Sequence, residues 1–446
     1  MAKFVRIRNS CALFLRRCQI DRACWRQRRR PVLAAAFFMG GFASAINATA
    51  QGILPPPPTD FFGVPPTLET TGTNQPGIMP APPMTAVPEK PLLEWGPVVF
   101  QPHLLYRLLY GDGVPAQPGQ DYKTYINQIY PGILFRIGDH WTLDYTPTIS
   151  LYSNRQFRDT LDHAVTLAGG TKVGDWTLGL SQGYVSSSQP LIETGGQTDT
   201  ETYPTAISAI YQASSVVSLQ LGANQEFRFV GQAPGGQALT DSKSWSTMDW
   251  VNYQVSPKLG TGIGFGFGYD EVTFGSDMTH EDLQARIDWR PGEKLSLSVS
   301  GGAQYRQYLS SDVPASLNPI YGASVLYQLF EPTALSLAAS RTYTPAYSQD
   351  QLSDATTISA SLRQRLLKKL ELDVSGGYFT TSYTATTVGV PVNRDDHGTF
   401  VNARLSAVVL KRATVAVFYA RSDNSSNVPG YSYSSSQVGL ELGYRF

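Results

Sequence analysis

The chain ends in the sequence Val438-Gly-Leu-Glu-Leu-Gly-Tyr-Arg-Phe446, in which apolar side chains alternate strictly with small or charged ones. Side chains of a β-strand point to opposite faces with a period of two, so this segment is predicted to be a strand with one apolar and one polar face. The apolar face comprises Val438, Leu440, Leu442, Tyr444 and Phe446. Soluble proteins rarely end in such a strand, whereas the strands of membrane barrels show this alternation throughout.

The same period extends back to about residue 95. Residues 263–269 alternate apolar or aromatic side chains with glycines, and residues 295–299 alternate leucine or valine with serine. Residues 141–151 alternate apolar side chains with threonine, aspartate and serine, and they are predicted to form one strand. No stretch shows a convincing apolar period of 3.6 residues, so the body of the chain is predicted to be all β.

The connections between these segments alternate in length. Eight short turns, such as Gly174-Asp175, alternate with nine longer polar loops, such as 189–199 and 384–395. They predict about 18 antiparallel strands, with 16 as the alternative, in a transmembrane up-and-down β-barrel. A β-sandwich, a propeller and a β-helix are the rival architectures. The chain shows no blade repeat of about 40 residues, and only a closed sheet leaves no unpaired edge in lipid.

The first 50 residues are predicted to be a secretory signal peptide. Residues 1–30 contain ten basic residues against the single acidic residue Asp21, residues 31–42 are mostly apolar, and Ala48-Thr49-Ala50 provides a small-residue cleavage site. The long basic region leaves open whether the start codon lies further on or the leader is extended. A basic arm that binds nucleic acid is the rival interpretation, and it leaves the apolar stretch and the cleavage site unexplained.

Removal of this leader changes the charge and the cysteine content. The whole chain has 35 basic and 35 acidic residues, and 25 basic and 34 acidic residues remain after residues 1–50, which is a net charge of −9. This balance argues against a body that binds nucleic acid. Because Cys11, Cys18 and Cys24 all lie in the leader, the mature chain is predicted to need no disulfide.

Residues 51–94 are predicted to form a Pro-rich linker in the periplasm. Between residue 51 and Pro97 the chain carries 13 of its 30 prolines, and apolar residues recur there at no regular period. The predicted organisation is therefore a signal peptide over 1–50, a linker over 51–94 and a barrel over 95–446.

If the apolar face of each strand meets lipid, the opposite face places a set of charged side chains in the lumen. These candidate lumen charges are Arg107, Arg136, Asp144, Glu226, Arg228, Arg286, Asp288, Arg306, Arg363, Asp373, Arg404 and Glu441. Two interpretations remain open. The interior is either a mixed-charge, water-filled or self-paired wall, or a lumen that selects polar or anionic solutes by charge.

Tryptophan and tyrosine recur near the predicted strand ends, for example Trp141, Trp176 and Trp289 beside short turns. Girdles of aromatic residues at the two membrane interfaces explain this placement, and a sugar-stacking track inside the lumen is the alternative.

Catalysis and cofactor binding have little support in the sequence. The five histidines are scattered singly without metal-ligand spacing, and Asp162-His163 forms a triad only with an arbitrary distant serine. The glycines at 262, 264, 266 and 268 suggest a phosphate loop, but they alternate with aromatic residues and no helix follows. The chain is therefore predicted to be no enzyme and to bind no metal and no cofactor.

The alternating carboxy-terminal strand that ends in Tyr444-Arg445-Phe446 resembles the β-signal of bacterial outer-membrane barrels. The resemblance implies that the barrel-assembly machinery reads this strand and that the strand closes the barrel. Together with the leader, the Pro-rich linker and about 18 strands, it makes the chain similar to the β-barrel porin 2-like family of outer-membrane proteins. Members of this family are often encoded with exopolysaccharide or capsule export systems.

This resemblance implies a location in the Gram-negative outer membrane, contact with its lipid and, as possible partners, polysaccharide export proteins. The expected function is a pore that passes polar solutes or an exported polysaccharide by passive diffusion through a charged lumen. The alternative is a non-conducting structural or assembly barrel of an envelope complex. No loop of 25 or more residues is available to fold inward, so the lumen is expected either to conduct freely or to be narrowed by another segment, such as the linker.

Overall fold

The computed structural model describes residues 93–112, 123–191, 193–232, 236, 238–367, 369–390, 392–410 and 412–446. All of them belong to one compact unit, Met39–Phe446. The predicted signal peptide and nearly all of the predicted linker lie outside the described residues. Strand pairing begins at Leu93, just inside the range predicted for the linker.

Twenty-two strands and no helix occur among the described residues. The strands are β1 Leu93–Trp95, β2 Val98–Asp112, β3 Thr124–Ile137, β4 Trp141–Tyr145, β5 Thr148–Tyr152, β6 Thr160–Val173, β7 Trp176–Ser187, β8 Pro190–Leu191, β9 Gly196–Gln197, β10 Thr200–Gln212, β11 Val217–Val230, β12 Ser242–Ser256, β13 Leu259–Val272, β14 Met278–Gly292, β15 Leu295–Tyr308, β16 Ser316–Phe330, β17 Thr333–Pro345, β18 Gln351–Leu366, β19 Leu370–Ala385, β20 Asp395–Leu410, β21 Ala413–Ser426 and β22 Tyr433–Arg445. No helix in the described part of the chain is long and apolar enough to span a membrane.

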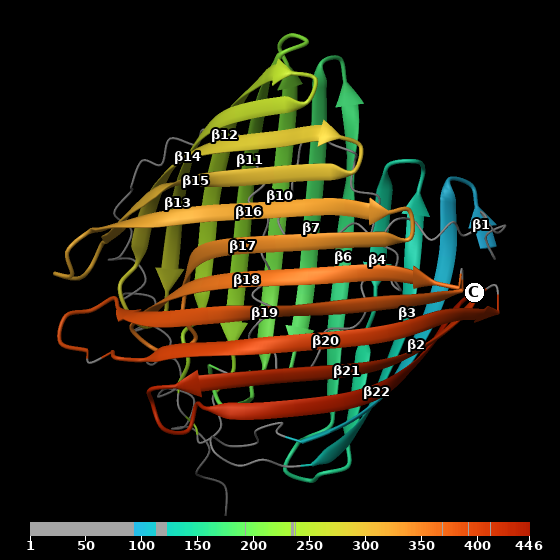
Figure 1. The fold of residues 1–446 in the computed structure, drawn as a ribbon. Helices are drawn as coiled ribbons and strands as arrows, with labels where there is room; N and C mark the ends of the chain where they lie inside the picture. Colours follow the sequence, from blue (N-terminus) through green and yellow to red (C-terminus); the bar gives the residue numbers. More distant parts are fainter. Residues whose placement is uncertain are drawn as a thin grey trace, which may run out of the picture. The chain divides into compact units, whose positions relative to one another are not determined.

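The long strands form a closed antiparallel barrel, in which each strand pairs with its neighbour along the chain (Figure 1). The last strand returns to the first, because β22 pairs with β2 from His103↔Arg445 to Asp112↔Ser436. With β4 and β5 sharing one position, eighteen strands surround the lumen. This confirms the predicted all-β fold and the predicted strand number for a transmembrane up-and-down barrel.

One predicted strand is divided. Residues 141–151 were expected to be continuous, but β4 ends at Tyr145 and β5 begins at Thr148. Pro147 has no backbone N–H to give to the ladder, whereas the N–H of Thr146 still donates to the carbonyl of Ala164 at 2.8 Å. The prediction of one continuous strand was therefore wrong at this proline, although both pieces pair with β3 and β6.

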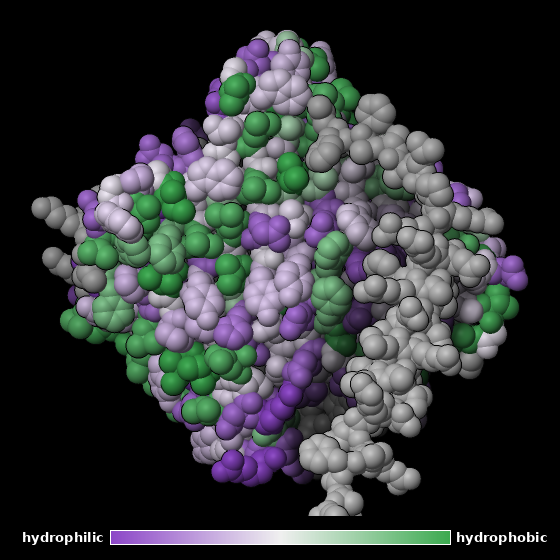
Figure 2. All heavy atoms as spheres, turned by 180° about the vertical axis from the view of Figure 1, so that it is seen from behind, coloured by the Kyte–Doolittle hydropathy of each residue, from purple (hydrophilic) through white to green (hydrophobic). Residues whose placement is uncertain are grey.

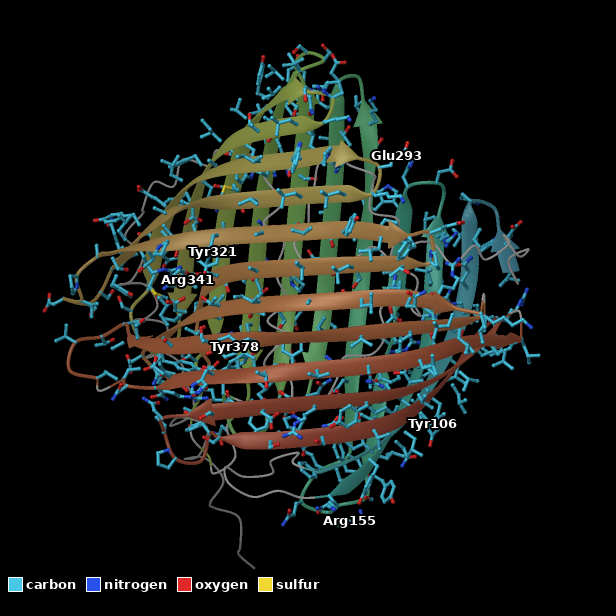
Figure 3. The ribbon with its side chains drawn as sticks, viewed as in Figure 1. Tyr106, Arg155, Glu293, Tyr321, Arg341 and Tyr378 are labelled. Carbon is cyan, nitrogen blue, oxygen red and sulfur yellow. The ribbon has the colours of Figure 1, made fainter. Side chains whose placement is uncertain are left out.

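Burial alternates along the strands and separates the two faces of the barrel. In β22 Gln437 and Glu441 are buried, while Val438 and Leu442 on the opposite face are exposed. Exposed apolar side chains continue around the outer wall, and Figure 3 shows Tyr321 and Tyr378 on it. An outward apolar face is the surface that a transmembrane barrel presents to lipid.

The inward glycines of β13 make room for large side chains of the neighbouring strands. A Cβ at Gly268 would lie 2.0 Å from His280 Nε2, and one at Gly264 would lie 2.7 Å from the ring of Trp250. These glycines therefore permit close packing inside the wall.

Most of the inner face is polar, but one part near the longer loops is apolar. Leu109, Ile126, Tyr152, Phe157 and Phe418 form a buried cluster there, contributed by β2, β3, β5, β21 and the loop after β5. This cluster fills part of the lumen beside the closing strands.

Candidate functional site

A continuous row of ion pairs crosses the inner face of β18, β19, β20, β22 and β2. Arg107 Nε lies 3.0 Å from Glu441 Oε1, and Arg404 Nε lies 2.9 Å from Glu441 Oε2. Arg404 Nη1 also lies 3.9 Å from Asp373 Oδ2, and Arg363 Nε lies 2.8 Å from Asp373 Oδ1. Guanidinium and carboxylate groups therefore alternate along this wall, and we call the row the charge ladder.

The charge ladder combines sequence-distant residues because the barrel closes there. Arg107 and Glu441 face each other across the β2–β22 pair, and Arg363 and Asp373 face each other across the β18–β19 pair. Arg107 is almost fully buried, with its guanidinium 4.5 Å from the ring centroid of Phe418. Since a buried charge is costly unless it is paired, each carboxylate of the ladder stabilises the guanidinium beside it.

Two further clusters lie on the inner face of β11–β15. Arg306 is fully buried and its Nη1 lies 3.0 Å from Asp270 Oδ2. Arg286 lies 3.4 Å from Asp288 Oδ2, and its Nη2 donates to Asn252 Oδ1 at 2.6 Å. The guanidinium of Arg286 also lies 4.4 Å above the ring of Trp250, which places this tryptophan inside the lumen and not in an outer girdle.

The structure places the remaining predicted lumen charges on the inner face as well, but outside the charge ladder. Asp144 accepts a hydrogen bond from Thr146 at 3.0 Å, and Arg228 donates to the carbonyl of Pro345 at 2.8 Å. Arg136 and Glu226 are exposed and lie near opposite ends of their strands, β3 and β11.

Solvent reaches part of the charge ladder and the Arg286 cluster. The side chains of Arg404 and Asp373 are 16% and 28% exposed, and that of Asp288 is 24% exposed. These groups lie on the inner wall, so the exposed fraction is exposed to the lumen. The arrangement provides a solvent-accessible interior whose arginines are mostly balanced by carboxylates.

A loop closes over the lumen at the end where the longer connections lie. The segment between β7 and β10 contains the short hairpin β8–β9, and Glu193 lies between the two strands of this hairpin. Its Oε1 accepts hydrogen bonds from the backbone N–H groups of Tyr347, and of Ser348 at 3.2 Å. Both residues follow β17, on the far side of the barrel from β7. The hairpin therefore reaches across the opening.

Arg394 holds the same hairpin from a third loop. Its Nη1 donates to the carbonyl oxygen of Glu193 at 3.2 Å, and its Nη2 donates to Asp396 Oδ2 at 2.6 Å. The guanidinium contacts two aromatic rings, at 4.6 Å from the ring centroid of Tyr383 and 3.7 Å from that of Tyr431. Cation–π contact and a buried ion pair thus hold one arginine against the hairpin tip. We call Glu193, Arg394 and their contacts the latch.

The loop after β11 joins the same assembly. The N–H of Thr240 donates to the carbonyl of Tyr347 at 2.9 Å, and Gln349 Nε2 donates to the carbonyl of Ala238 at 2.8 Å. The guanidinium of Arg228 lies 4.1 Å from the ring of Tyr347. No single loop of 25 or more residues folds inward in the described part of the chain. Several shorter loops, bonded to one another, instead reach across this end of the lumen.

The latch has unusual electrostatics. Burial raises the pKa of the Glu193 carboxyl above its usual value, and the positive charges of Arg228 and Arg394 oppose this shift. The second carboxylate oxygen, Oε2, is buried and has no hydrogen-bond partner among the described residues. The carboxylate form of Glu193 is therefore poorly satisfied where it lies.

Sequence reasoning missed Asp270, Glu193, Arg394 and Glu371, whose Oε1 lies 3.2 Å from Arg363 Nε in the charge ladder. Glu371 and Asp270 could have been found, because they alternate in phase with Asp373 and with the glycines of β13. Glu193 and Arg394 lie in loops without a period, so no sequence signal marks them. Among the described residues no cluster of histidine, cysteine or acidic side chains could hold a metal ion.

No family model matches the chain, and no curated protein matches it. Solved structures similar to it include OccK11 (OpdR) of Pseudomonas aeruginosa, with 13% identity, 78% of this chain and 96% of that chain covered, and a TM-score of 0.39. OccK2 (OpdF) of the same bacterium has 10% identity, covers 78% of this chain and 98% of that chain, and has a TM-score of 0.43. OccAB3 of Acinetobacter baumannii has 10% identity, coverages of 78% and 99%, and a TM-score of 0.42. The barrel assignment rests on the strand order and closure described above.

Proposed function

We propose that this protein is an outer-membrane pore through which small polar solutes diffuse passively. The observation that carries the proposal is the solvent-accessible, charged inner wall inside a barrel whose outer wall is apolar. Water and polar solutes can pass through a lumen lined in this way, because its charged side chains replace the hydrogen bonds to water that a solute loses on entry. Substrate passage needs no cofactor and no chemical step in this mechanism.

The charge ladder supports a preference for neutral or zwitterionic solutes over ions of one sign. Arg107, Arg404 and Arg363 are each paired with a carboxylate, so the wall carries donors and acceptors but little net charge. This favours the self-paired interpretation of the lumen charges over a sieve for anions. Passage of an exported polysaccharide is the narrower form of the proposal. It requires the hairpin at Glu193 to swing out of the opening.

The location follows from the same wall. A closed barrel with an outward apolar face belongs in the outer membrane of Gram-negative bacteria. Because the strand number is even, the first strand begins and the last strand ends on the side of the short turns. We place this side, and with it the predicted linker, in the periplasm. The assembly machinery would then meet β22 at its final residues.

A second function is favoured by the latch. The N–H groups of Tyr347 and Ser348 donate to the Glu193 carboxylate, Arg394 donates to the Glu193 carbonyl, and these bonds connect the loops across the opening. A barrel closed permanently in this way would be a non-conducting structural component of an envelope complex.

Single-channel conductance in a planar bilayer distinguishes the two functions. We would compare the wild type with Arg394→Gln, which removes the cation–π contacts and the ion pair from the latch. Arg421→Gln is the matched control, because Arg421 pairs with Asp423 on the outer face at 2.8 Å. We expect the wild type and the control to conduct and Arg394→Gln to conduct about twofold more or with longer openings. Folded, inserted protein that is silent in all three forms would reject the pore and favour the structural barrel.

A further inference from the structure

Five polar side chains lie together on the outer face of the barrel, on the consecutive strands β7, β10, β11 and β12. They are Gln182, Thr205, Gln225, Thr247 and Asp249, and we call them the outer polar patch. The strand register places Gln182 opposite Thr205, and Thr205 opposite Gln225. Each of the five lies near the middle of its strand, so the patch lies at the depth of the hydrocarbon layer in an inserted barrel.

The surroundings of the patch establish that it faces outward. Ile207 and Val251, which occupy the same face of β10 and β12, are 44% and 58% exposed. Phe265, directly opposite Asp249 in the β12–β13 pair, is 56% exposed. On other strands the outward positions near mid-strand carry Leu283, Val299, Leu337, Val401 and Leu440. On the face seen in Figure 2, hydrophilic residues interrupt the hydrophobic surface.

Two of the patch side chains occupy breaks in the strand ladders. The β11–β12 ladder is interrupted beside Asp249, whose Oδ1 accepts a hydrogen bond from the N–H of Gly222 at 3.4 Å. The β7–β10 ladder is interrupted at Pro204, and Gln182 Nε2 donates to the carbonyl of Pro204 at 3.4 Å. The polar side chains therefore complete the wall itself, and the strand pairing keeps them at this position.

Of the five residues in the outer polar patch, Asp249 is the one whose exposure to lipid costs the most free energy, because its side chain is ionisable. No salt-bridge partner of Asp249 occurs in the described part of the chain. Several other outward charges are paired and lie closer to the long-loop strand ends, such as Arg341 with Asp354 at 2.6 Å, and Figure 3 shows Arg341 there. An unpaired carboxylate in hydrocarbon is costly, whereas a polar partner surface removes the cost.

We propose that the outer polar patch is the contact surface between two copies of this chain in the membrane. Around a two-fold axis along the membrane normal, one flank of the patch meets the opposite flank of the second copy. Asp249 on β12 then faces the Gln182 amide of the second copy. Both residues lie at similar distances from the short-turn ends of their strands, Trp176 and Ser256, so they meet at the same depth.

This geometry also explains why the partner is a second copy. The two Asp249 carboxylates lie at opposite flanks of the interface, which keeps the like charges apart. Thr205 and Gln225, on the two central strands, lie near the axis, and hydroxyl and amide groups both donate and accept hydrogen bonds. The patch is therefore complementary to itself, as an isologous interface must be.

Cysteine cross-linking in isolated outer membranes tests the proposal. In a background with Cys11, Cys18 and Cys24 replaced by serine, Thr205→Cys near the axis is expected to give a disulfide-linked dimer on mild oxidation. Ala360→Cys is the matched control, because Ala360 faces outward near the middle of β18, far from the patch. A dimer from Thr205→Cys and monomer from Ala360→Cys support the proposal. Monomer from both variants, equal dimer from both, or a Thr205→Cys adduct with a different protein overturns it.

A second experiment does not depend on cross-linking. In mild detergent we expect the wild type to have the mass of a dimer and the double variant Asp249→Leu, Gln182→Leu to dissociate at least about tenfold more readily. Heat-modifiable migration of both proteins shows that they are folded barrels, so a folding defect is recognised separately. A wild type that is monomeric throughout, or a double variant that is as dimeric as the wild type, rejects the interface. This inference rests on membrane insertion but not on conduction, so a silent barrel would leave it intact.

Discussion

Glu193 is a carboxylate that the structure buries with only part of its charge satisfied. It is buried at the hairpin tip, its Oε1 accepts two backbone N–H groups, and its Oε2 has no hydrogen-bond partner among the described residues. Burial raises the pKa of Glu193, and Arg228 and Arg394 offset only part of the shift. A proton therefore binds more tightly to Glu193 in the latched hairpin than in a released one.

This difference predicts a pH-dependent opening. In a released hairpin Glu193 regains its usual pKa. The raised pKa therefore stabilises the latched hairpin fully when the pH is below the usual pKa, and this stabilisation is lost as the pH rises through the raised pKa. Acid therefore favours the latched hairpin, and conductance is expected to fall as the pH is lowered through the raised pKa of Glu193 toward its usual value. Single-channel recordings across this range measure the effect.

The control for this prediction is Glu193→Gln, which keeps the acceptor oxygen for the N–H groups of Tyr347 and Ser348 but does not titrate. We expect its conductance to be low and to be independent of pH over the same range. An equal response to pH in the wild type and in Glu193→Gln would contradict the assignment of the effect to Glu193.

At the scale of single residues, the sequence predicts the face of a side chain better than its partners. The period of two places Glu441 and Arg107 on the polar face of their strands, because alternation is a local property. Their 3.0 Å contact depends on the pairing of two strands at opposite ends of the chain, and no local pattern encodes it. Arg394 was not predicted at all, since loop residues have no periodicity and its partners come from other loops.

Among the elements, β13 shows how small residues on one strand position large residues on its neighbours. Its inward glycines leave space for Trp250 on β12 and His280 on β14. His280 Nδ1 in turn lies 3.4 Å from Asp282 and 3.3 Å from the amide of Gln304. The position of this polar cluster therefore requires glycine at position 268 of β13, because any side chain there would occupy the space of the His280 ring.

We predict that Gly268→Ala destabilises the barrel. The new Cβ would lie 2.0 Å from His280 Nε2, so the imidazole must move and its contacts with Asp282 and Gln304 must break. Overpacking of this kind typically costs about 1–3 kcal/mol in the free energy of unfolding. Urea-induced unfolding of the refolded barrel measures this loss.

Gly301→Ala is the matched control, because a Cβ on that strand glycine meets no atom within 4 Å. Its free energy of unfolding is expected to change by less than about 0.5 kcal/mol. Equal stability of the two variants would show that the imidazole adjusts without cost and that the inward glycines are not needed for packing.

Element boundaries were largely predictable because turns and loops have a distinct composition. The exceptions have local physical causes. Pro147 divides β4 from β5 through a missing N–H, a loss that alternation of side chains does not reveal. The hairpin β8–β9 crosses the opening because Glu193 finds N–H donors on the far side, and a polar loop sequence gives no direction for that crossing.

For the whole molecule, the decisive step is closure by the last strand. β22 pairs with β21 on one side and with β2 on the other. Its outward face continues to the final residue, where the N–H of Phe446 donates to the carbonyl of Pro102 at 3.0 Å and the Tyr444 and Phe446 rings lie 4.8 Å apart. Until β22 is in place, β2 and β21 each leave an unpaired edge, which lipid does not tolerate.

We therefore predict that Phe446→Ala, and more strongly the deletion of Tyr444 to Phe446, prevents assembly in the outer membrane. The altered chains should still cross the inner membrane, so they should accumulate unfolded in the periplasm or be degraded there. Tyr378→Ala is the matched control, because Tyr378 and Phe446 are both outward-facing aromatic residues, each 45% exposed. Fractionation combined with heat-modifiable migration on gels measures the folded barrel in each case. A loss confined to the Phe446 variants would assign to the carboxyl end a role in assembly beyond its contact with lipid. Equal losses in Phe446→Ala and Tyr378→Ala would show that Phe446 acts only as an aromatic residue of the outer wall. Normal levels of folded barrel in the deletion variant would exclude a β-signal.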